Sequence, residues 1–415
     1  MNAMNNMDPS GSSGSWLGKA IVVVLVWVVL AGGGYWFFAG RGGQPAKDDR
    51  AARQPGTEPG KGGGSDAGPA QPAITIGVAY GTEKRAWLEW AVEQFAQNEE
   101  GKRIQVNLIP MGSLEGAHAI LEGDKRIHVW SPASSLYREV FLAEWQLNHS
   151  GSPIAKEEVL ALTPMVFVTW KNRYDALKAH YPEITFESIS QALQMEGGWG
   201  GIAKKPDWGL FKFGHTDPNK SNSGLMALVL MAYDFHGKNN NLALADIVKP
   251  EFQTWLAQLE RGVTARSDST GTLMREMVLK GPSSFDAVMV YESVAIDFLK
   301  SAEGRWGTLQ VVYPKRNMWS DNPYCILKTD WTTPAHQAAA EKFLRFLMSP
   351  AAQKKALDHG FRPGDPAVPV KFPESPFVKY EDHGLTIDLT TICDPPTAEV
   401  INNLLQTWQR AAGPR

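Results

Sequence analysis

The sequence predicts an α/β protein with two lobes, and three observations support this prediction. From residue 74 onward, apolar strand patterns alternate with amphipathic helical patterns. After residue 163, a second set of such patterns follows the first. The chain has 415 residues, of which 43% are hydrophobic and 20% charged, and this is enough for two lobes with cores of their own. Because the alternation implies parallel strands joined by helices, we expect ligands to bind at the carboxyl ends of the strands.

The first 72 residues are predicted to hold a tail, a membrane anchor and a linker. After a short tail over 1–19, residues 20–39 (AIVVVLVWVVLAGGGYWFFA) carry no charge over about the length of a bilayer-spanning helix. A cleavable signal peptide is the alternative, but its apolar core would be shorter. Residues 40–72 are rich in Gly, Pro, Ala and charge and lack aromatic side chains, so we expect a disordered linker.

The charges around the predicted anchor favour a cytoplasmic C-terminal side under the positive-inside rule. Lys19 and the α-amine precede the span, whereas more positive charge follows it, at Arg41, Lys47, Arg50 and Arg53. We nevertheless predict that the C-terminal domain lies outside the cytoplasm, because capturing a solute has no evident use inside the cell.

The first set of patterns predicts three strands, at 74–80, 103–110 and 127–130. Between the first two strands, one helical stripe carries Trp87, Leu88, Ala91, Val92 and Phe95. A short helix is predicted from Leu114. The strands end in small polar corners, at 81–84, 111–113 and 131–135.

The second set begins with residues 164–170 (PMVFVTW), whose apolar run predicts a buried strand. Further strands are predicted at 286–291, 308–313 and 324–327. Helices are predicted near 175–180, 186–194, 224–235, 252–260 and 272–279. Two consecutive helices follow at 336–349 and 350–360, the second with Pro350 in its first turn and Gly360 as its stop.

The stretch HTDPNKSNSG (215–224) connects a predicted strand to the apolar helix of the second set. The free N–H groups at the start of this helix, with the hydroxyls of Ser221 and Ser223, would suit an anion or a polar oxygen. Plain helix capping by Asp217, Ser221 and Ser223 is the alternative. Since similar corners occur in both sets, we expect them to face one cleft.

The motifs together resemble bacterial extracytoplasmic solute-binding proteins of the type II periplasmic fold, in particular the branch of molybdate-binding and other oxyanion-binding proteins. The resemblance covers about 74–370 and rests on TDPNKSNSGL before a long apolar helix, on IHVWSPASSLYREVF (127–141) and on AVMVYESVAIDF (287–298). It implies a receptor whose two lobes close on a small ligand around crossing strands.

The resemblance also implies ligand-binding positions at four points of the chain. These are the first loop with Thr82, Glu83 and Lys84, the second with Ser131 and Ser134, the helix start with Asp217, Ser221, Asn222 and Ser223, and the strand end with Tyr291 and Glu292. The charges of Glu83, Lys84, Lys220 and Glu292 suit a zwitterionic or peptide-like ligand as well as an oxyanion.

The same resemblance places the lobe boundaries. The first lobe would comprise about 74–163 and 322–370, and the second about 166–314, within one domain over 73–370. The hinge would be formed by 164–170 and 321–327. Residues 371–415 are expected to extend beyond the domain and to pack on the first lobe.

Several other functions find no support in the sequence. A net charge of −3 and the lack of a basic run argue against nucleic-acid binding. No catalytic motif, cofactor fingerprint or metal-ligand spacing occurs, so we predict neither enzyme activity nor a cofactor or metal site. Cys325 and Cys393 could form one disulfide or remain free thiols.

The fifteen tryptophans raise the alternative of carbohydrate binding. Those on apolar stripes are expected in the core, at Trp87, Trp130, Trp170 and Trp255, while three in loops are candidates for a cleft rim, Trp199, Trp208 and Trp319. The sequence therefore predicts a monomeric, membrane-anchored, extracytoplasmic solute-binding protein for a small polar or anionic ligand, working with an ABC permease. The alternative is a ligand sensor or envelope adaptor of the same fold.

Overall fold

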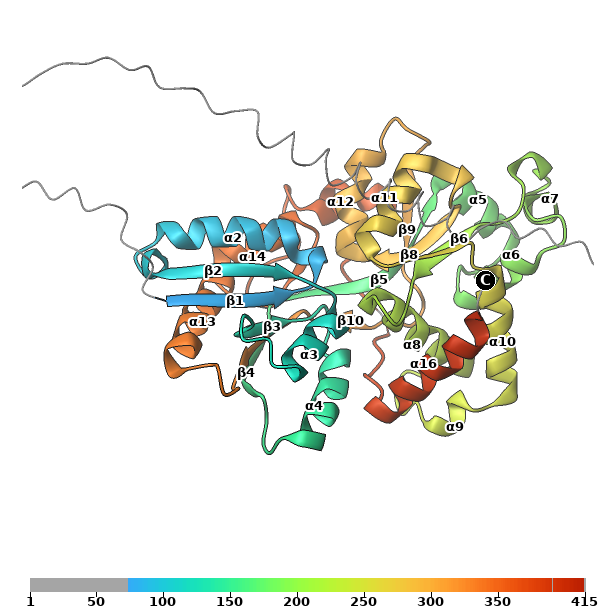
Figure 1. Ribbon diagram of the computed structural model, residues 1–415. Coiled ribbons are helices and arrows are strands. Elements are labelled where there is room, and N and C mark those ends of the chain that lie inside the picture. The colour runs from blue at the N-terminus through green and yellow to red at the C-terminus, as the bar shows by residue number, and fades with distance from the viewer. Residues whose placement is uncertain (1–73, 390, 414–415) are drawn as a thin grey trace, which may run out of the picture. The chain divides into compact units, whose positions relative to one another are not determined.

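The computed structural model describes residues 74–389 and 391–413. The predicted tail, anchor and linker lie outside the described residues. Within the described part of the chain, no helix has both the length and the apolar character that crossing a membrane requires. The described residues form two sheets, each with its own covering helices (Figure 1).

The first sheet has five strands in the order β2-β1-β3-β11-β4. β1 (Ile74–Tyr80) pairs in parallel with both of its neighbours, β2 (Ile104–Pro110) and β3 (Val129–Ser131). β11 (Pro323–Leu327) runs antiparallel to β3 and to β4 (Ile154–Val159). Three parallel strands thus end at one edge, as the strand-helix alternation predicted.

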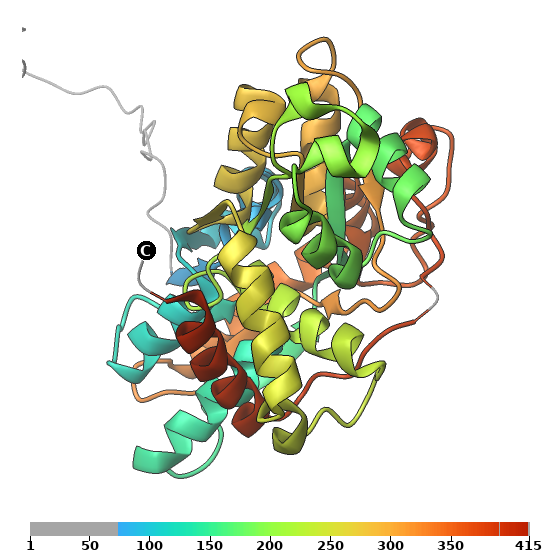
Figure 2. The same ribbon diagram turned by 90° about the vertical axis from the view of Figure 1, so that its right-hand side faces the viewer.

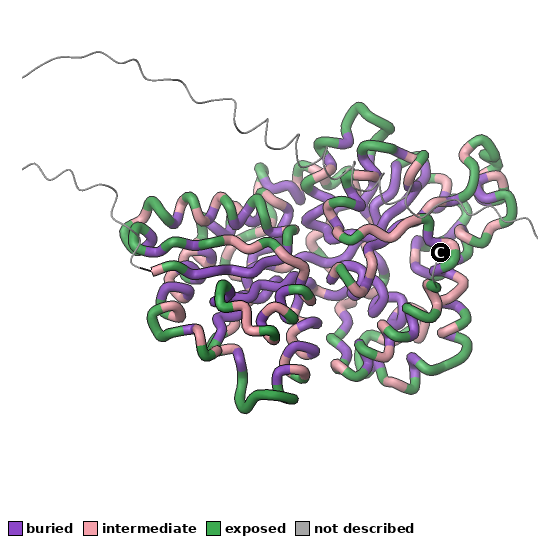
Figure 3. Tube along the Cα trace, viewed as in Figure 1, coloured by how far each residue is buried: buried purple, intermediate pink, exposed green. Residues whose placement is uncertain are grey.

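Alternating side chains of β1 divide between the two faces of this sheet. Ile76, Val78 and Tyr80 pack in one apolar cluster with α2 (Arg85–Gln97), α13 (Pro334–Leu347) and α14 (Pro350–Asp358). Ala79 belongs to the opposite cluster, with α3 (Ser113–Leu121) and α4 (Leu136–Asn148). The sheet therefore forms the middle layer of a three-layer lobe, and its buried strands are visible in Figure 3.

The second sheet is organised around β5 (Ala161–Trp170), which is longer than the strand predicted from the sequence. β5 pairs antiparallel with four strands: β8 (Ala287–Tyr291), β9 (Leu309–Val312), β10 (Trp319–Ser320) and β12 (Arg362–Pro363). β6 (Phe213–Thr216) lies parallel to β8 and to β7 (Ala265–Ser267).

The helices of the second lobe surround α8 (Asn222–His236), whose first twelve residues are all buried. A helix that is apolar on all sides must be covered on all sides, and α8 contacts strands β5, β6 and β8 as well as neighbouring helices. The other helices are α5 (Lys171–His180), α6 (Phe186–Gln194), α7 (Trp199–Ala203), α9 (Leu244–Ile247), α10 (Pro250–Gly262), α11 (Thr270–Lys280) and α12 (Glu292–Ala302).

The chain crosses between the two sheets from β4 to β5 through Leu160, and back from β10 to β11 through Asp321 and Asn322. The two crossings are bonded to each other, because Leu160 N donates to Asn322 O at 3.2 Å. Asn322 has a φ of 42°, a left-handed conformation that Asn tolerates better than most residues. Its side-chain amide donates to Ala161 O and Ser320 O, which fixes the turn.

The C-terminal extension packs mainly on the second lobe, so the expected packing on the first lobe is wrong. α16 (Ala398–Ala412) contacts α8, α9 and α10 and reaches only α4 of the first lobe (Figures 1 and 2). Its apolar residues recur at helical spacing and are buried, at Val400, Ile401, Leu404 and Trp408. The amphipathic pattern predicted the helix, but it carries no information about which lobe offers the matching apolar face.

Both cysteines are free and buried, Cys325 in β11 and Cys393 in the C-terminal extension. The core positions predicted for four tryptophans are confirmed at Trp87, Trp130, Trp170 and Trp255. Trp199 is also fully buried, and its ring nitrogen donates to Asp286 Oδ2 at 3.1 Å. The prediction of a cleft-rim position for Trp199 is therefore wrong.

Candidate functional site

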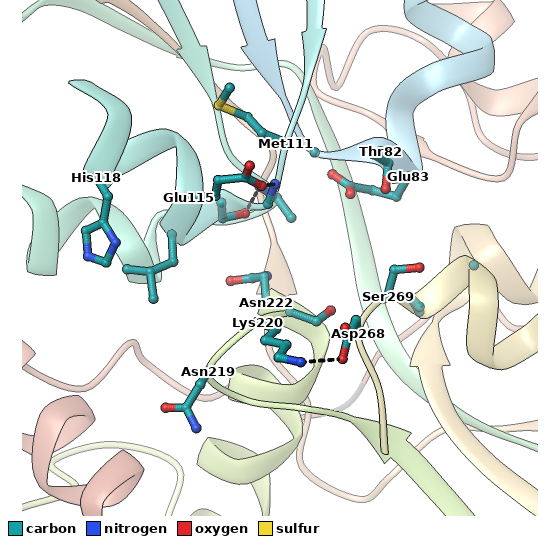
Figure 4. A pocket seen from close by; sticks show the side chains of 18 of the residues that line it. Thr82, Glu83, Met111, Glu115, His118, Asn219, Lys220, Asn222, Asp268 and Ser269 are labelled. Carbon is teal, nitrogen blue, oxygen red and sulfur yellow. Dashed lines mark hydrogen bonds and ion pairs between the residues drawn. The ribbon is translucent and has the colours of Figure 1, made fainter. Parts of the chain in front are cut away.

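A cavity of about 660 Å³ lies between the two lobes, beside the carboxyl ends of strands from both sheets. Its lining comes largely from four strand-to-helix corners, 81–83 after β1, 111–115 after β2, 219–222 after β6 and 268–271 after β7. Figure 4 shows the side chains that these corners contribute. The volume falls in the range of sites for small organic molecules.

Glu83 and Lys84 form the first corner and face in different directions. Glu83 lines the cavity, whereas Lys84 is fully buried behind it. Lys84 Nζ donates to Glu83 Oε1 at 2.7 Å, to Asn322 Oδ1 at 2.9 Å and to Pro132 O at 3.2 Å. Burial lowers the pKa of Lys84, and Glu83 opposes that shift. The lysine therefore links the cavity wall to the crossing between the lobes.

The second corner and α3 add two further carboxylates and a histidine. Glu115 Oε2 accepts a hydrogen bond from Gly112 N at 3.0 Å, so this side chain caps the first turn of α3. His118 and Glu122 follow Glu115 along the same helix and line the cavity as well. The first-lobe wall is consequently rich in negative charge.

The stretch 215–224 forms a tight corner at which Gly224 is required. A Cβ on Gly224 would lie 2.3 Å from Thr216 O, too close for any side chain. Ser223 Oγ is bonded within the second lobe, to Thr216 Oγ1 at 2.7 Å and Thr270 Oγ1 at 2.6 Å. Ser221 lines the cavity, but Ser223 is buried behind it.

Asn222 connects the two lobes. Its Oδ1 accepts from Ser134 Oγ of the first lobe at 2.8 Å, while its Nδ2 donates to Tyr291 Oη at 2.8 Å. Tyr291 ends β8 and lines the cavity, and burial together with the nearby Glu83 charge raises its pKa well above the usual range. A second bond between the lobes runs from Tyr137 Oη to Pro218 O at 3.0 Å. The lobes are therefore in contact beside the cavity.

The corner after β7 was not predicted from the sequence. Asp268, Ser269 and Thr270 line the cavity, and Asp268 Oδ1 pairs with Lys220 Nζ at 2.9 Å. β7 has only three residues and lacks an apolar run, so no strand pattern pointed to this corner. The run SDSTGT (267–272) before a helix was the available signal, since it resembles the corner at 215–224.

The sequence profile of a family described as bacterial extracellular solute-binding protein matches residues 76–362. This match covers more than half of the chain. The chain belongs to this family. The family consists of binding proteins, and the two-lobed type II architecture expected from the motifs is confirmed. No curated protein matches the sequence.

Solved structures of solute-binding proteins share the fold. The sulfate-binding protein SubI from Mycobacterium tuberculosis has 17% identity and a TM-score of 0.51, with 79% of this chain and 96% of that chain covered. The binding protein AfuA from Actinobacillus pleuropneumoniae, bound to fructose-6-phosphate, has 14% identity, a TM-score of 0.56 and coverages of 81% and 98%. Iron-bound HitA from Pseudomonas aeruginosa has 14% identity, a TM-score of 0.54 and coverages of 81% and 99%. At these identities the likeness shows the fold alone.

Five of the eleven residues predicted to bind ligand in this solute-binding fold line the cavity: Thr82, Glu83, Ser221, Asn222 and Tyr291. The other six lie outside its lining. Lys84, Ser134 and Ser223 make the buried contacts described above, and Ser131 is buried with no partner for its hydroxyl among the described residues. Asp217 Oδ1 accepts from Asn219 N at 2.8 Å and so shapes the turn before α8, but it does not cap the helix, whose N-cap residue Ser221 makes no side-chain capping bond.

Glu292 is the clearest departure from the prediction. Its carboxylate is fully buried at the start of α12 and forms two hydrogen bonds with Arg362, Nη2 to Oε1 at 2.7 Å and Nε to Oε2 at 2.8 Å. Tyr313 Oη also donates to Glu292 Oε1. Burial raises the pKa of Glu292 against the effect of Arg362. Glu292 therefore lies outside the cavity lining, and its place at the end of a strand did not reveal that the side chain turns into the core.

The cavity is lined mainly by groups that form hydrogen bonds and ion pairs. Within 74–389 and 391–413, no group of three or more His, Cys, Asp or Glu side chains is arranged to hold a metal ion. The hydroxyl, amide and carboxylate groups that line the cavity can donate and accept hydrogen bonds with a small polar molecule.

Proposed function

We propose that the chain is an extracytoplasmic solute-binding protein that encloses a small polar ligand between its two lobes and delivers it to an ABC-type importer. The observation that carries this proposal is the cavity at the carboxyl ends of strands from both sheets, beside a direct Ser134–Asn222 bond between the lobes. Opening would break this bond and expose the cavity, and closing would shield a bound solute from water.

The chain crossings support movement of one lobe relative to the other. Among the residues that the structure describes, short crossings near Leu160 and Asn322 join the two sheets, and a third runs from α14 to β12, which pairs with β5. The lobe boundaries predicted at 163–166 and 314–322 belong to this proposal. Family membership supports transport as the purpose, and the sulfate, sugar-phosphate and iron ligands of the structural neighbours show how varied the solutes of this fold are.

We also propose that the protein works as a monomer, without enzymatic activity, and that residues 20–39 anchor it to the membrane. The uncharged stretch has about the length of a bilayer span, and the linker that follows would let the domain reach a permease. The motifs that resemble the oxyanion-binding branch support the fold in this proposal. They do not identify the ligand, which depends on the charged groups that line the cavity.

The location can be tested by adding protease to intact cells. We expect cleavage near 62–64, within the Gly-rich linker, with release of the folded domain. Complete protection in intact cells, with cleavage only after lysis, would place the domain inside and contradict the proposal. Transport is tested by deleting the gene and measuring uptake of the solute that stabilises the purified protein; unchanged uptake would contradict the role in import.

A further inference from the structure

We infer that the ligand carries a positively charged amine and that Glu83 is its counter-ion in the cavity. The inference rests on the proposed function, because it names the class of solute that the same cavity takes. The side chains of the lining include four carboxylates, of Glu83, Glu115, Glu122 and Asp268, against one lysine, Lys220. An anion placed among these groups would be repelled, whereas a cation would be attracted.

Glu83 provides an acceptor that the protein leaves open. Its side chain is only 10% exposed, and it lines the cavity. Lys84 binds Oε1, and Oε2 accepts no hydrogen bond from any described residue. The carboxylate lies over Gly81, where a Cβ would be 2.3 Å from Oε1 and 2.6 Å from Oε2. The oxygen that no described residue occupies is therefore available to accept a charge-assisted hydrogen bond from an ammonium group of a ligand.

Lys84 cannot serve an anionic ligand in place of Glu83. Its ammonium group has three N–H donors, and the three acceptors Glu83 Oε1, Asn322 Oδ1 and Pro132 O take all of them. It is fully buried behind Glu83. The bond from Lys84 therefore fixes the orientation of the Glu83 side chain, which lines the cavity.

Two of the helix starts around the cavity, those of α3 and α11, have an N–H donor occupied by the protein's own side chains. Gly112 N before α3 donates to Glu115 Oε2, and Thr272 N in α11 donates to Ser269 Oγ, whereas the start of α8 has no side-chain cap. Lys220, the one lining lysine, is paired with Asp268. An oxyanion would thus find its free helix donors mainly at the start of α8, where the carboxylates of the lining oppose a negative charge.

The inference is tested with the purified full-length protein in detergent, by following thermal unfolding through tryptophan fluorescence. The probes are three amines, putrescine, spermidine and lysine, three oxyanions, sulfate, phosphate and molybdate, and uncharged glucose, each up to about 10 mM. We expect at least one amine to raise the Tm by about 3 °C or more at saturation. We expect the oxyanions to give no such rise.

Glu83→Gln should abolish the shift produced by the amine, while the matched control Glu89→Gln on the exposed face of α2 should retain it. Because Glu83→Gln leaves Lys84 buried without its carboxylate, the double variant Glu83→Gln/Lys84→Met removes both charges and should also lose the shift. An equal shift in wild type and in either Glu83 variant would overturn the role of Glu83.

The remaining outcomes separate this inference from the proposed function. Stabilisation by an oxyanion or by glucose, with no effect of the amines, would overturn the inference and leave the binding function intact. If none of the seven compounds stabilises the wild-type protein, the amine assignment is overturned, while the proposed function is decided separately by the uptake measurement described above.

Discussion

Replacing Ser134 by Ala should shift the protein toward an open arrangement of its lobes. Ser134 Oγ donates to Asn222 Oδ1 across the two lobes, and Ser134 lies outside the lining of the cavity. The substitution removes this bond without removing a ligand contact. Ser134 Oγ also accepts a long bond of 3.4 Å from Leu136 N, but both residues belong to the first lobe, so this loss affects open and closed forms alike.

The magnitude follows from the worth of one hydrogen bond. A neutral bond contributes about 0.5 to 1.5 kcal/mol, and in the open form Asn222 can bond to water instead. The ratio of closed to open molecules should therefore fall by about two- to twelve-fold, since 1.4 kcal/mol corresponds to a factor of ten. The affinity for a ligand that binds the closed form should weaken by the same factor.

Single-molecule energy transfer between two dyes can measure this ratio without a ligand. The dyes would be attached to cysteines introduced at Gln97 on the first lobe and Lys205 on the second, both of which are exposed. Cys325 and Cys393 are buried, so they should not react. Ser135→Ala is the matched control, because the Ser135 hydroxyl makes no hydrogen bond within the described residues, and its backbone bond to Asp321 persists. Equal populations in wild type, Ser134→Ala and Ser135→Ala would refute the reasoning.

Three further results are expected. Glu292→Gln should lower the free energy of unfolding by about 3 to 5 kcal/mol, because it leaves buried Arg362 without its partner, yet ligand affinity should stay unchanged. If Glu292→Gln weakens ligand binding while the protein remains folded, and the exposed control Glu303→Gln does not, Glu292 would be a ligand-binding residue. Leu404→Ala, at a fully buried position of α16, should lower the free energy of unfolding by about 2 to 5 kcal/mol. Calorimetry should show a much smaller decrease in the free energy of unfolding for the half-buried Leu405→Ala. Burial and nearby His336 lower the pKa of His128 from 6.5 to about 4, so the unfolded chain binds the proton first as the pH falls. Wild type should therefore lose stability between pH 6.5 and about 4, whereas His128→Gln should lose less; parallel curves would contradict the assignment to His128.

The sequence predicted the elements whose pattern is set locally. β1 and α6 (Phe186–Gln194) occur at their predicted residues, because a short apolar segment rich in β-branched residues favours a strand and a regular amphipathic period favours a helix. β4 was missed because its residues IAKEEV are mostly exposed and charged, as an edge strand allows. Its place in the sheet is set by pairing with β11, which comes more than 160 residues later in the chain.

The site was predictable in part for a similar reason. Small polar residues after an apolar strand indicate a corner such as 81–84, and the fold brings such corners to the edge of the sheet at which the parallel strands end. The direction of each side chain depends on distant partners. The Lys84 side chain turns inward because Asn322 Oδ1 and Pro132 O accept hydrogen bonds from its ammonium group. The Glu292 side chain turns inward because the Arg362 guanidinium donates hydrogen bonds to its carboxylate. None of these partners is close in sequence, so periodicity could not separate cavity-lining residues from buried ones.

The C-terminal extension has a practical consequence for work on this family. The family profile ends at residue 362, yet the guanidinium of Arg362 itself donates to Thr386 O and Ile387 O, within the extension. Tyr233 of α8 likewise donates to Asp394 O, and α16 covers the apolar sides of α8 and α10. A gene fragment cut where the family match stops would encode a second lobe with its apolar flank exposed to solvent. The folded unit of this chain therefore extends beyond the residues that the family profile matches.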